Sequence, residues 1–281
     1  MKNIQETIKK VTALLATSPV KYPQSLLRKH DLNKPFDVEN LKYLTQGGGA
    51  GGYFQWLTLL MQNSDAKLIV ELGNRYGSST LAIHHGLKKS QRLVTIDTEH
   101  DQRYVTPEVF KNPQIDFVFG DCVQLNSFLK AGIQIPTDID ILWSDTIHYD
   151  EQVSAEFYVY EPLLADEALI LVDDIHLNDK GKFFARMKYW KVDLAKECHG
   201  NGFGVIHYVR PANQRANTKE ERIQEAIIRS SQVYQKRWLN LFENERQLES
   251  RLHTMQKERR IATIKRLLGP KLLTFINKLR N

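Results

Sequence analysis

The chain has few cysteines and lacks a long apolar run. Its two cysteines, Cys122 and Cys198, are too few for a disulfide framework and do not have metal-ligand spacing, so we expect two reduced thiols. No uninterrupted apolar segment approaches the ~20 residues of a membrane span, and the first residues lack the apolar stretch of a signal peptide. We therefore expect a cytoplasmic protein, and its hydrophobic fraction of 42% is ordinary for a globular chain.

The positive charge is concentrated in one part of the 281 residues. The formal net charge is +6, but from Lys236 onward twelve Lys and Arg stand against four Glu, which leaves about −2 for the rest. Any affinity for polyanions should therefore reside in this C-terminal segment. Because few aromatic residues are interleaved with the basic ones, we do not expect binding to nucleic acid.

The pattern of apolar residues divides the chain into three parts. Residues 1–52 are predicted to form a helical N-terminal cap that ends in a glycine-rich loop, which is either a flexible linker or a mobile loop near a ligand. Residues 53–212 alternate between helices and strands, with strands predicted at 68–72, 92–96, 115–119, 139–144, 168–173 and 203–209. This alternation predicts an α/β fold of the Rossmann-like kind, a mostly parallel seven-stranded sheet with an antiparallel last strand.

Residues 213–281 are predicted to form a basic helical C-terminal extension. One helical stripe carries its large apolar residues, which are Trp238, Leu241, Leu248, Leu252, Met255 and Ala262. We expect the helix to stop at Gly269 and Pro270, a C-cap glycine followed by a proline. The stripe packs on the protein's own domain, joins two chains as a homodimer, or binds another partner, and the basic end suits an anionic membrane surface.

The stretch from Leu68 to Thr80 predicts a buried strand, a glycine turn and a helix. Gly73 and Gly77 let backbone N–H groups approach a ligand, and Ser78, Ser79 and Thr80 are candidates to cap the helix. The next predicted strand ends in Asp97, about 20 residues beyond the glycines, where dinucleotide folds place a carboxylate on ribose hydroxyls. These features predict an adenosine-type ligand.

Carboxylates follow two later strands of the predicted sheet. Asp145 ends one strand and Asp173 and Asp174 end the next, so all three should meet at one edge. Three converging carboxylates repel one another unless a cation or protons neutralise them, and Mg²⁺ would suit this donor set. His148 lies three residues beyond Asp145, and a histidine has an ordinary pKa near ~6.5, appropriate for a general base.

The Glu71-Leu72-Gly73 stretch, with Gly77 and Ser78 after it, resembles motif I of class I S-adenosylmethionine-dependent methyltransferases, and most closely the catechol O-methyltransferase-like group. The Asp145-x-x-His148 spacing also resembles a bacterial group acting on sugars and natural products. The resemblance implies S-adenosylmethionine as cofactor, held by residues at Glu71, Gly73, Gly77, Ser78 and Asp97, with Asp121 against the adenine.

The same resemblance implies the metal ligands and the base. Asp145, Asp173 and Asp174 match the magnesium ligands of the catechol group, with Asp174 in place of an asparagine, and His148 stands where that group has a catalytic lysine. The extra negative charge leaves the identity of the metal open. Asp145 and His148 are therefore the expected catalytic residues.

The expected function is a metal-assisted O-methyltransferase that acts on a vicinal diol or catechol-like hydroxyl of a small molecule or sugar. Three alternatives stay open: a metal-independent methyltransferase with His148 as the base, a nicotinamide-binding oxidoreductase, and a non-catalytic scaffold with the same fold. Arg75 and Tyr76 would crowd a pyrophosphate, which disfavours the nicotinamide alternative.

Overall fold

The computed structural model describes residues 3–18, 20, 22, 52–99 and 107–280, which form two compact units, Met1–Ser231 and Gln232–Asn281. The expected glycine-rich loop falls almost entirely outside these residues, with Gly52 alone inside them. In the described ranges no helix combines the length and apolar character needed to cross a membrane. The three-part division at residues 52 and 212 stays a prediction.

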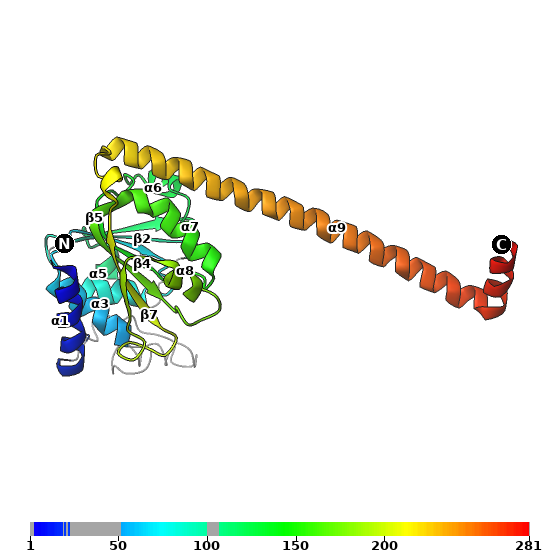
Figure 1. Cartoon of the computed structure of the whole chain (residues 1–281), viewed down its shortest axis with the longest axis horizontal. Coiled ribbons are helices and arrows are strands. Elements are labelled where there is room, and N and C mark those ends of the chain that lie inside the picture. The colour runs from blue at the N-terminus through cyan, green and yellow to red at the C-terminus, as the bar shows by residue number, and fades with distance from the viewer. Residues whose placement is uncertain (1–2, 19, 21, 23–51, 100–106, 281) are drawn as a thin grey trace. The chain divides into compact units, whose positions relative to one another are not determined.

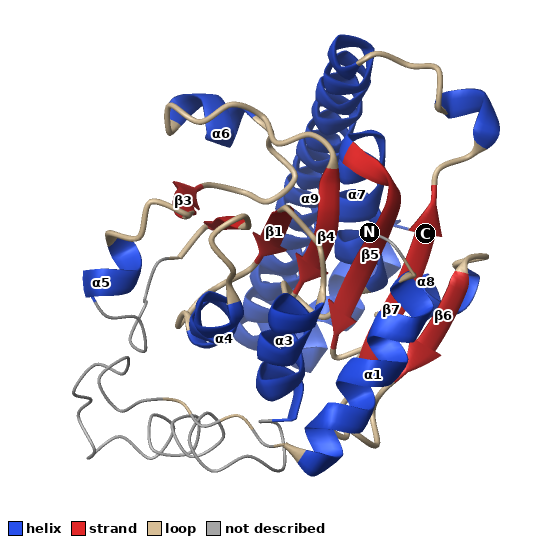
Figure 2. Cartoon of the chain, turned by 90° about the vertical axis from the view of Figure 1, so that its left-hand side faces the viewer, coloured by secondary structure: helices blue, strands red, loops and turns tan. Residues whose placement is uncertain are grey.

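The first unit contains a seven-stranded sheet in the order β3-β2-β1-β4-β5-β7-β6 (Figure 2). The strands are β1 Leu68–Leu72, β2 Arg92–Asp97, β3 Ile115–Phe119, β4 Ile139–Ser144, β5 Leu164–Asp173, β6 Trp190–Asp193 and β7 Phe203–Val209. Strands β1 to β5 pair in parallel, and β7 runs antiparallel to both β5 and β6. The predicted mixed sheet is confirmed, although the sequence analysis had not located β6.

Helices cover both faces of this sheet, and Figure 2 shows α1, α3 and α4 on one face and α7 on the other. The helices are α1 Ile4–Thr17, α3 Gly52–Asn63, α4 Ser78–Gly86, α5 Pro107–Phe110, α6 Asn126–Lys130, α7 Asp150–Tyr160, α8 Gly181–Arg186 and α9 Lys219–Arg280 (Figure 1). Because the inner strands are covered on both sides, their sequences are nearly continuous apolar runs.

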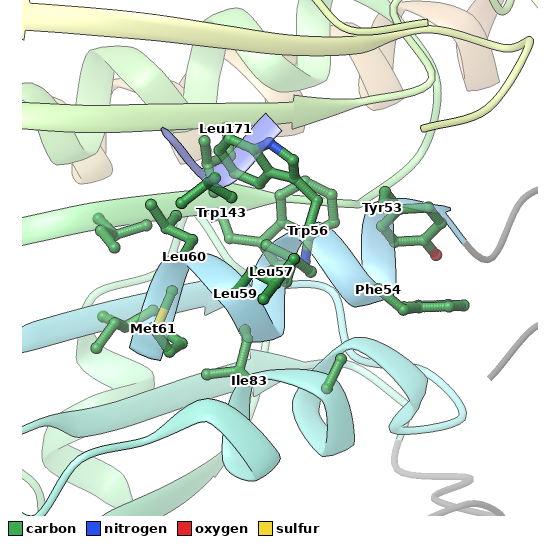
Figure 3. Close-up of a cluster of buried hydrophobic side chains, with 14 of the residues drawn as sticks. Tyr53, Phe54, Trp56, Leu57, Leu59, Leu60, Met61, Ile83, Trp143 and Leu171 are labelled. Carbon is green, nitrogen blue, oxygen red and sulfur yellow. The ribbon is translucent and has the colours of Figure 1, made fainter. Parts of the chain in front are cut away.

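The core lies between α3 and the sheet. Trp56, Leu57 and Leu60 of α3 are fully buried and belong to one cluster with Trp143 of β4 and Leu171 of β5 (Figure 3). Ile4, Ile8 and Val11 of α1 join the same cluster, so a helix is present near the N-terminus, over Ile4–Thr17, within the region predicted to be helical.

Helix α9 differs from the prediction at its C-terminal end. It continues through Gly269 and Pro270 to Arg280, so the expected stop at these residues is wrong. A proline inside a helix removes one backbone hydrogen bond and bends the helix without having to end it. Figure 1 shows the ribbon turning near its red end.

The first part of α9 is bound to the sheet unit by polar side chains. Arg222 Nη2 donates to Asp138 Oδ1 at 2.6 Å. Ser230 Oγ donates to the carbonyl oxygen of Val123 at 2.6 Å and accepts from the backbone N–H of Leu125 at 3.3 Å. The start of α9 therefore holds the loop that follows β3.

The order of the strands reverses between β1 and β4, which is where open α/β sheets bind ligands. Leu72 of β1 is paired with Ser144 of β4, and the backbone N–H of Asp145 donates to the Leu72 carbonyl at 2.9 Å. Gly73 follows with a φ of +86°, and a Cβ there would lie 2.2 Å from the carbonyl oxygen of Asp145. The glycine thus permits the two strand ends to meet.

Gly73→Ala should therefore disrupt this junction. Gly132 is a matched control, because it has a similar φ of +73° and an added Cβ would meet no other described atom within 4 Å. We expect Gly132→Ala to cost about 1 kcal/mol from backbone strain alone, and Gly73→Ala to cost clearly more. Urea unfolding of both variants measures the difference, and equal costs would mean that the close approach to Asp145 is unimportant.

Candidate active site

The glycine turn after β1 is held by a buried carboxylate. Glu71 is fully buried and its two oxygens accept from Ser79 Oγ and Thr80 Oγ1, each at 2.6 Å. The N-cap of α4 is Gly77, which has no side chain that could cap the helix. The expected capping by Ser78, Ser79 or Thr80 is therefore wrong. The hydroxyls of Ser79 and Thr80 tie the helix to β1 instead. Contact of Glu71, Gly73, Gly77 and Ser78 with a cofactor stays a prediction.

Asp97 lies at the end of β2, beside the same turn. Its Oδ2 accepts from the backbone N–H groups of Asn74 at 2.7 Å and Arg75 at 2.8 Å. Asp97 therefore braces the turn, and its contact with a ribose stays a prediction.

Asn74 was not among the expected site residues. It is buried, and its Nδ2 donates to Thr95 Oγ1 at 2.8 Å. Its Oδ1 has no hydrogen-bond partner among the described residues. A buried acceptor without a partner is costly, so this atom marks a place where a bound polar group would be favourable.

Asp121 follows β3 at the same edge of the sheet. Its Oδ1 accepts from the backbone N–H of Val123 at 3.0 Å, the geometry of a turn aspartate. Its contact with an adenine stays a prediction.

The carboxyl ends of β4 and β5 bring the expected acidic residues to one edge, since Ser144 pairs with Val172 in a parallel ladder. Asp173 Oδ1 lies 2.6 Å from His199 Nε2, a contact between two buried side chains. Asp174 Oδ2 lies 3.0 Å from His148 Nδ1. Asp173, Asp174 and His199 place one donor atom each within 4.8 Å of one another, an arrangement that could hold a metal ion.

His199 was missed by the sequence analysis, and Asp145 does not join this group. His199 lies in the loop between β6 and β7, and no motif in the sequence marks it. The charges of the group still act on Asp145. Burial raises the pKa of Asp145 well above the usual range, and Asp173 and Asp174 raise it further, whereas the charge of Lys180 lowers it. Its role as a metal ligand stays a prediction.

The two histidines shift the charge balance at this edge. Burial alone would lower the pKa of His199, but the bond to Asp173 and the charges of Asp173 and Asp174 outweigh burial and raise it. Burial opposes ionisation of Asp174, yet the contact with His148 and the charges of His148 and His199 lower the pKa of Asp174. These directions favour the ionised form of Asp174 and the protonated form of His199.

Asp174 also has a left-handed backbone, with a φ of +55°. This conformation is uncommon for residues other than glycine, and asparagine and aspartate tolerate it best. Strain of this kind concentrates at functional sites, where it aims a side chain. Here it coincides with the carboxylate that meets His148.

Two further residues complete the site, and the sequence patterns did not predict either of them there. Lys180 is fully buried, its Nζ lies 3.5 Å from the Ser144 carbonyl oxygen, and its charge lowers the pKa of both Asp145 and Glu156. The ring of Tyr53 lies 5.0 Å from that of His199, and the pKa of Tyr53 is raised by burial and by Asp173 and Asp145. Lysine and tyrosine in these positions place a cation and a phenol among the carboxylates.

The sheet order and the glycine turn at the point where it reverses are those of class I methyltransferases. Residues 70–175 match a family described as "Methyltransferase domain". The O-methyltransferase hkm8 of Aspergillus hancockii is 24% identical over 144 residues, which are 50% of this chain and 54% of that protein. The chain thus spans about half the length of this curated relative.

Three solved structures are similar to the chain, each with a TM-score of 0.47. A methyltransferase from Geobacter sulfurreducens is 19% identical, and the alignment covers 72% of this chain and 97% of that chain. PaMTH1 of Podospora anserina, bound to S-adenosylhomocysteine, is 17% identical, with 75% of this chain and 98% of that chain covered. TomG of Streptomyces achromogenes, in complex with S-adenosylmethionine, is 15% identical, with 75% and 100% covered.

Residues 70–175 thus match a methyltransferase domain and lie within a seven-stranded sheet of the class I kind. This confirms the class expected from motif I.

The buried carboxylate Glu71 predicts a pH dependence of stability. Burial raises its pKa from 4.5 to about 7 in spite of the bonds from Ser79 and Thr80. The contribution of Glu71 to the free energy of unfolding is fully present below pH 4.5, where Glu71 is protonated in both the folded and the unfolded state. It is lost as pH rises through about 7. The shift corresponds to roughly 3 kcal/mol.

Glu71→Gln should remove this dependence of the free energy of unfolding on pH. The amide imitates the protonated acid and still forms hydrogen bonds with the hydroxyls of Ser79 and Thr80. Urea unfolding of wild type and variant from pH 5 to 9 tests it. Parallel curves for the two proteins would contradict the raised pKa.

Lys180→Met should destabilise the protein by about 3 kcal/mol or more, because it leaves Asp145 and Glu156 without a buried counter-charge. Lys182→Met is the control: this neighbour is 67% exposed and pairs with Asp179, so its loss should cost under about 1 kcal/mol. Denaturant unfolding of the two variants measures both costs. Similar small losses would show that the Lys180 ammonium does not stabilise the cluster.

Proposed function

We propose that the protein is an S-adenosylmethionine-dependent O-methyltransferase that methylates a hydroxyl of a small molecule or sugar. The convergence of the glycine turn, the Asp173–Asp174 pair and His148 at the carboxyl ends of β1, β4 and β5 carries the proposal. It brings a cofactor turn and a proton acceptor to one edge of the sheet. The name of hkm8 supports oxygen as the methylated atom.

The turn suits the cofactor for two reasons. The first N–H groups of α4 lack acceptors within the helix, as at any helix start, and favour a ligand with negative charge or lone pairs. Asn74 Oδ1 is a buried hydrogen-bond acceptor that has no donor among the described residues and could accept from the cofactor. Methyl transfer from a sulfonium then requires mainly alignment of donor and acceptor, so positioning by the protein should dominate catalysis.

A divalent cation fits the group of Asp173, Asp174 and His199. Two carboxylates suit Mg²⁺ or Mn²⁺, and the imidazole extends the set to other first-row metals. When bound, such a cation would hold adjacent oxygens of a diol or catechol and lower the pKa of one hydroxyl.

His148 is the residue we propose to accept the proton of the acceptor hydroxyl. It is one third exposed, with 34% of its side chain accessible, and its ring lies against Asp174. The carboxylate orients the ring and stabilises the imidazolium that forms, as in other paired acid–base sites. Tyr53 lies at the same edge, where Asp173 and Asp145 add to burial in raising its pKa.

The cofactor assignment predicts micromolar binding of S-adenosylhomocysteine and no comparable binding of NAD, measured by calorimetry. Gly73→Ala should weaken binding at least about tenfold because it displaces the turn, while Gly132→Ala should leave it unchanged. Tight NAD binding would favour an oxidoreductase, and failure of both ligands would favour a non-catalytic scaffold.

The metal assignment predicts that Mn²⁺ binds the protein and that His199→Ala weakens it about 10- to 100-fold. His176→Ala is the control, since this exposed histidine bonds Asp193 and lies outside the group of three. Electron paramagnetic resonance of free Mn²⁺ in a titration measures both. Normal S-adenosylhomocysteine binding with no bound Mn²⁺ would favour a metal-independent enzyme with His148 as its base.

A further inference from the structure

Helix α9 carries a row of exposed apolar side chains beyond residue 231. The exposed fractions are 41% for Tyr234, 50% for Trp238, 62% for Leu241, 64% for Leu248 and 54% for Met255. Long helices are stabilised mainly by packing of an apolar face, and contiguous exposed apolar residues on a protein surface mark an interaction site. This row therefore requires an explanation.

The spacing of the row is seven residues. Tyr234, Leu241, Leu248 and Met255 recur at one heptad position, and Ala262 continues the series in the sequence. Trp238 precedes Leu241 by three residues and Leu252 precedes Met255 by the same interval, which gives the second position of an a/d pattern. We call these residues the heptad stripe. A strict seven-residue repeat produces a narrow seam that supercoils with another helix.

The charges beside the heptad stripe distinguish a helical partner from a membrane. Residues 232–258 carry five Lys and Arg and four Glu, whereas residues 259–281 carry seven Lys and Arg and no acidic residue. A membrane-surface helix has a strongly basic polar face. The basic excess thus lies beyond the part of the stripe that is richest in large apolar residues.

Glu245 makes the membrane alternative still less favourable. It occupies the stripe position between Trp238 and Leu252, where an acyl-chain environment would have to desolvate its charge. In a coiled coil a polar residue at one such position is tolerated and selects the register, at a cost in stability.

We propose that the heptad stripe of α9 pairs with the same stripe of a second copy of this chain, as a coiled coil. Identical stripes are complementary, because each apolar side chain inserts between four residues of the facing helix. With a net charge of +1 over residues 232–258, two copies do not repel strongly along this part of the helix. The proposal concerns assembly alone and does not depend on the proposed reaction.

The test is sedimentation equilibrium of the full-length protein with two matched variants. Leu241→Glu with Leu248→Glu places charges in the stripe, and Asn240→Glu with Gln247→Glu places the same charges one position away, where both side chains are also exposed. We expect at least twice the chain mass of 32.6 kDa for wild type and the control, and a dissociation constant raised at least about 100-fold in the stripe variant.

All the substituted side chains are exposed in the single chain, so the sheet unit should fold normally in both variants, with unchanged thermal unfolding of that unit. A monomeric wild type at 50 μM, or equal assembly of all three proteins, would overturn the proposal. Flotation of a monomeric wild type with phosphatidylcholine–phosphatidylserine vesicles would instead assign the stripe to a membrane surface.

Discussion

Crowding of carboxylates at one edge of the sheet is the constraint on which the site depends. Asp173 and Asp174 lie there with Asp145 near enough for their charges to raise its pKa, and Glu71 and Glu156 are buried. Such charges are tolerated only with partners, because an isolated buried carboxylate loses its hydration. The protein supplies three kinds of compensation: hydroxyl donors to Glu71 and Glu156, imidazoles beside Asp173 and Asp174, and the Lys180 ammonium. The chemistry we propose uses charges that the fold has already placed.

Local sequence patterns predicted the parts of the fold that depend on local rules. The buried strands of the parallel sheet are near-continuous apolar runs, and the turn after β1 is marked by Gly73 and Gly77, both of which have positive φ. Strand β6 is four residues long, is only half-buried and pairs with β7 alone, so it has little pattern of its own. The expected helix stop at Gly269 failed because a local breaker signal does not decide where a long helix ends.

The site was predictable where strand ends supply it and unpredictable where tertiary packing does. Asp145, Asp173 and Asp174 follow strands whose order brings all three to one edge of the sheet, but Asp145 does not join the group of Asp173, Asp174 and His199. His199 and Lys180 come from a hairpin loop and from the start of a short helix, and only the folded chain brings them to the carboxylates. Ser79 and Thr80 resembled capping residues because hydroxyls often cap helices. In the folded chain both hydroxyls instead donate hydrogen bonds to the buried carboxylate of Glu71.

The contacts between α9 and the loop after β3 bear on where the smallest folding unit ends. A chain that stopped at residue 212 would retain every strand of the sheet and would lose Arg222 and Ser230. The Val123 carbonyl and the Leu125 N–H would lose their partner, and so would the Asp138 carboxylate. Each lost hydrogen bond contributes about 1 kcal/mol to stability, so such a fragment would be a weakened domain in which the segment after Asp121 is loosened first. For expression of an autonomous domain, the boundary belongs beyond Ser231.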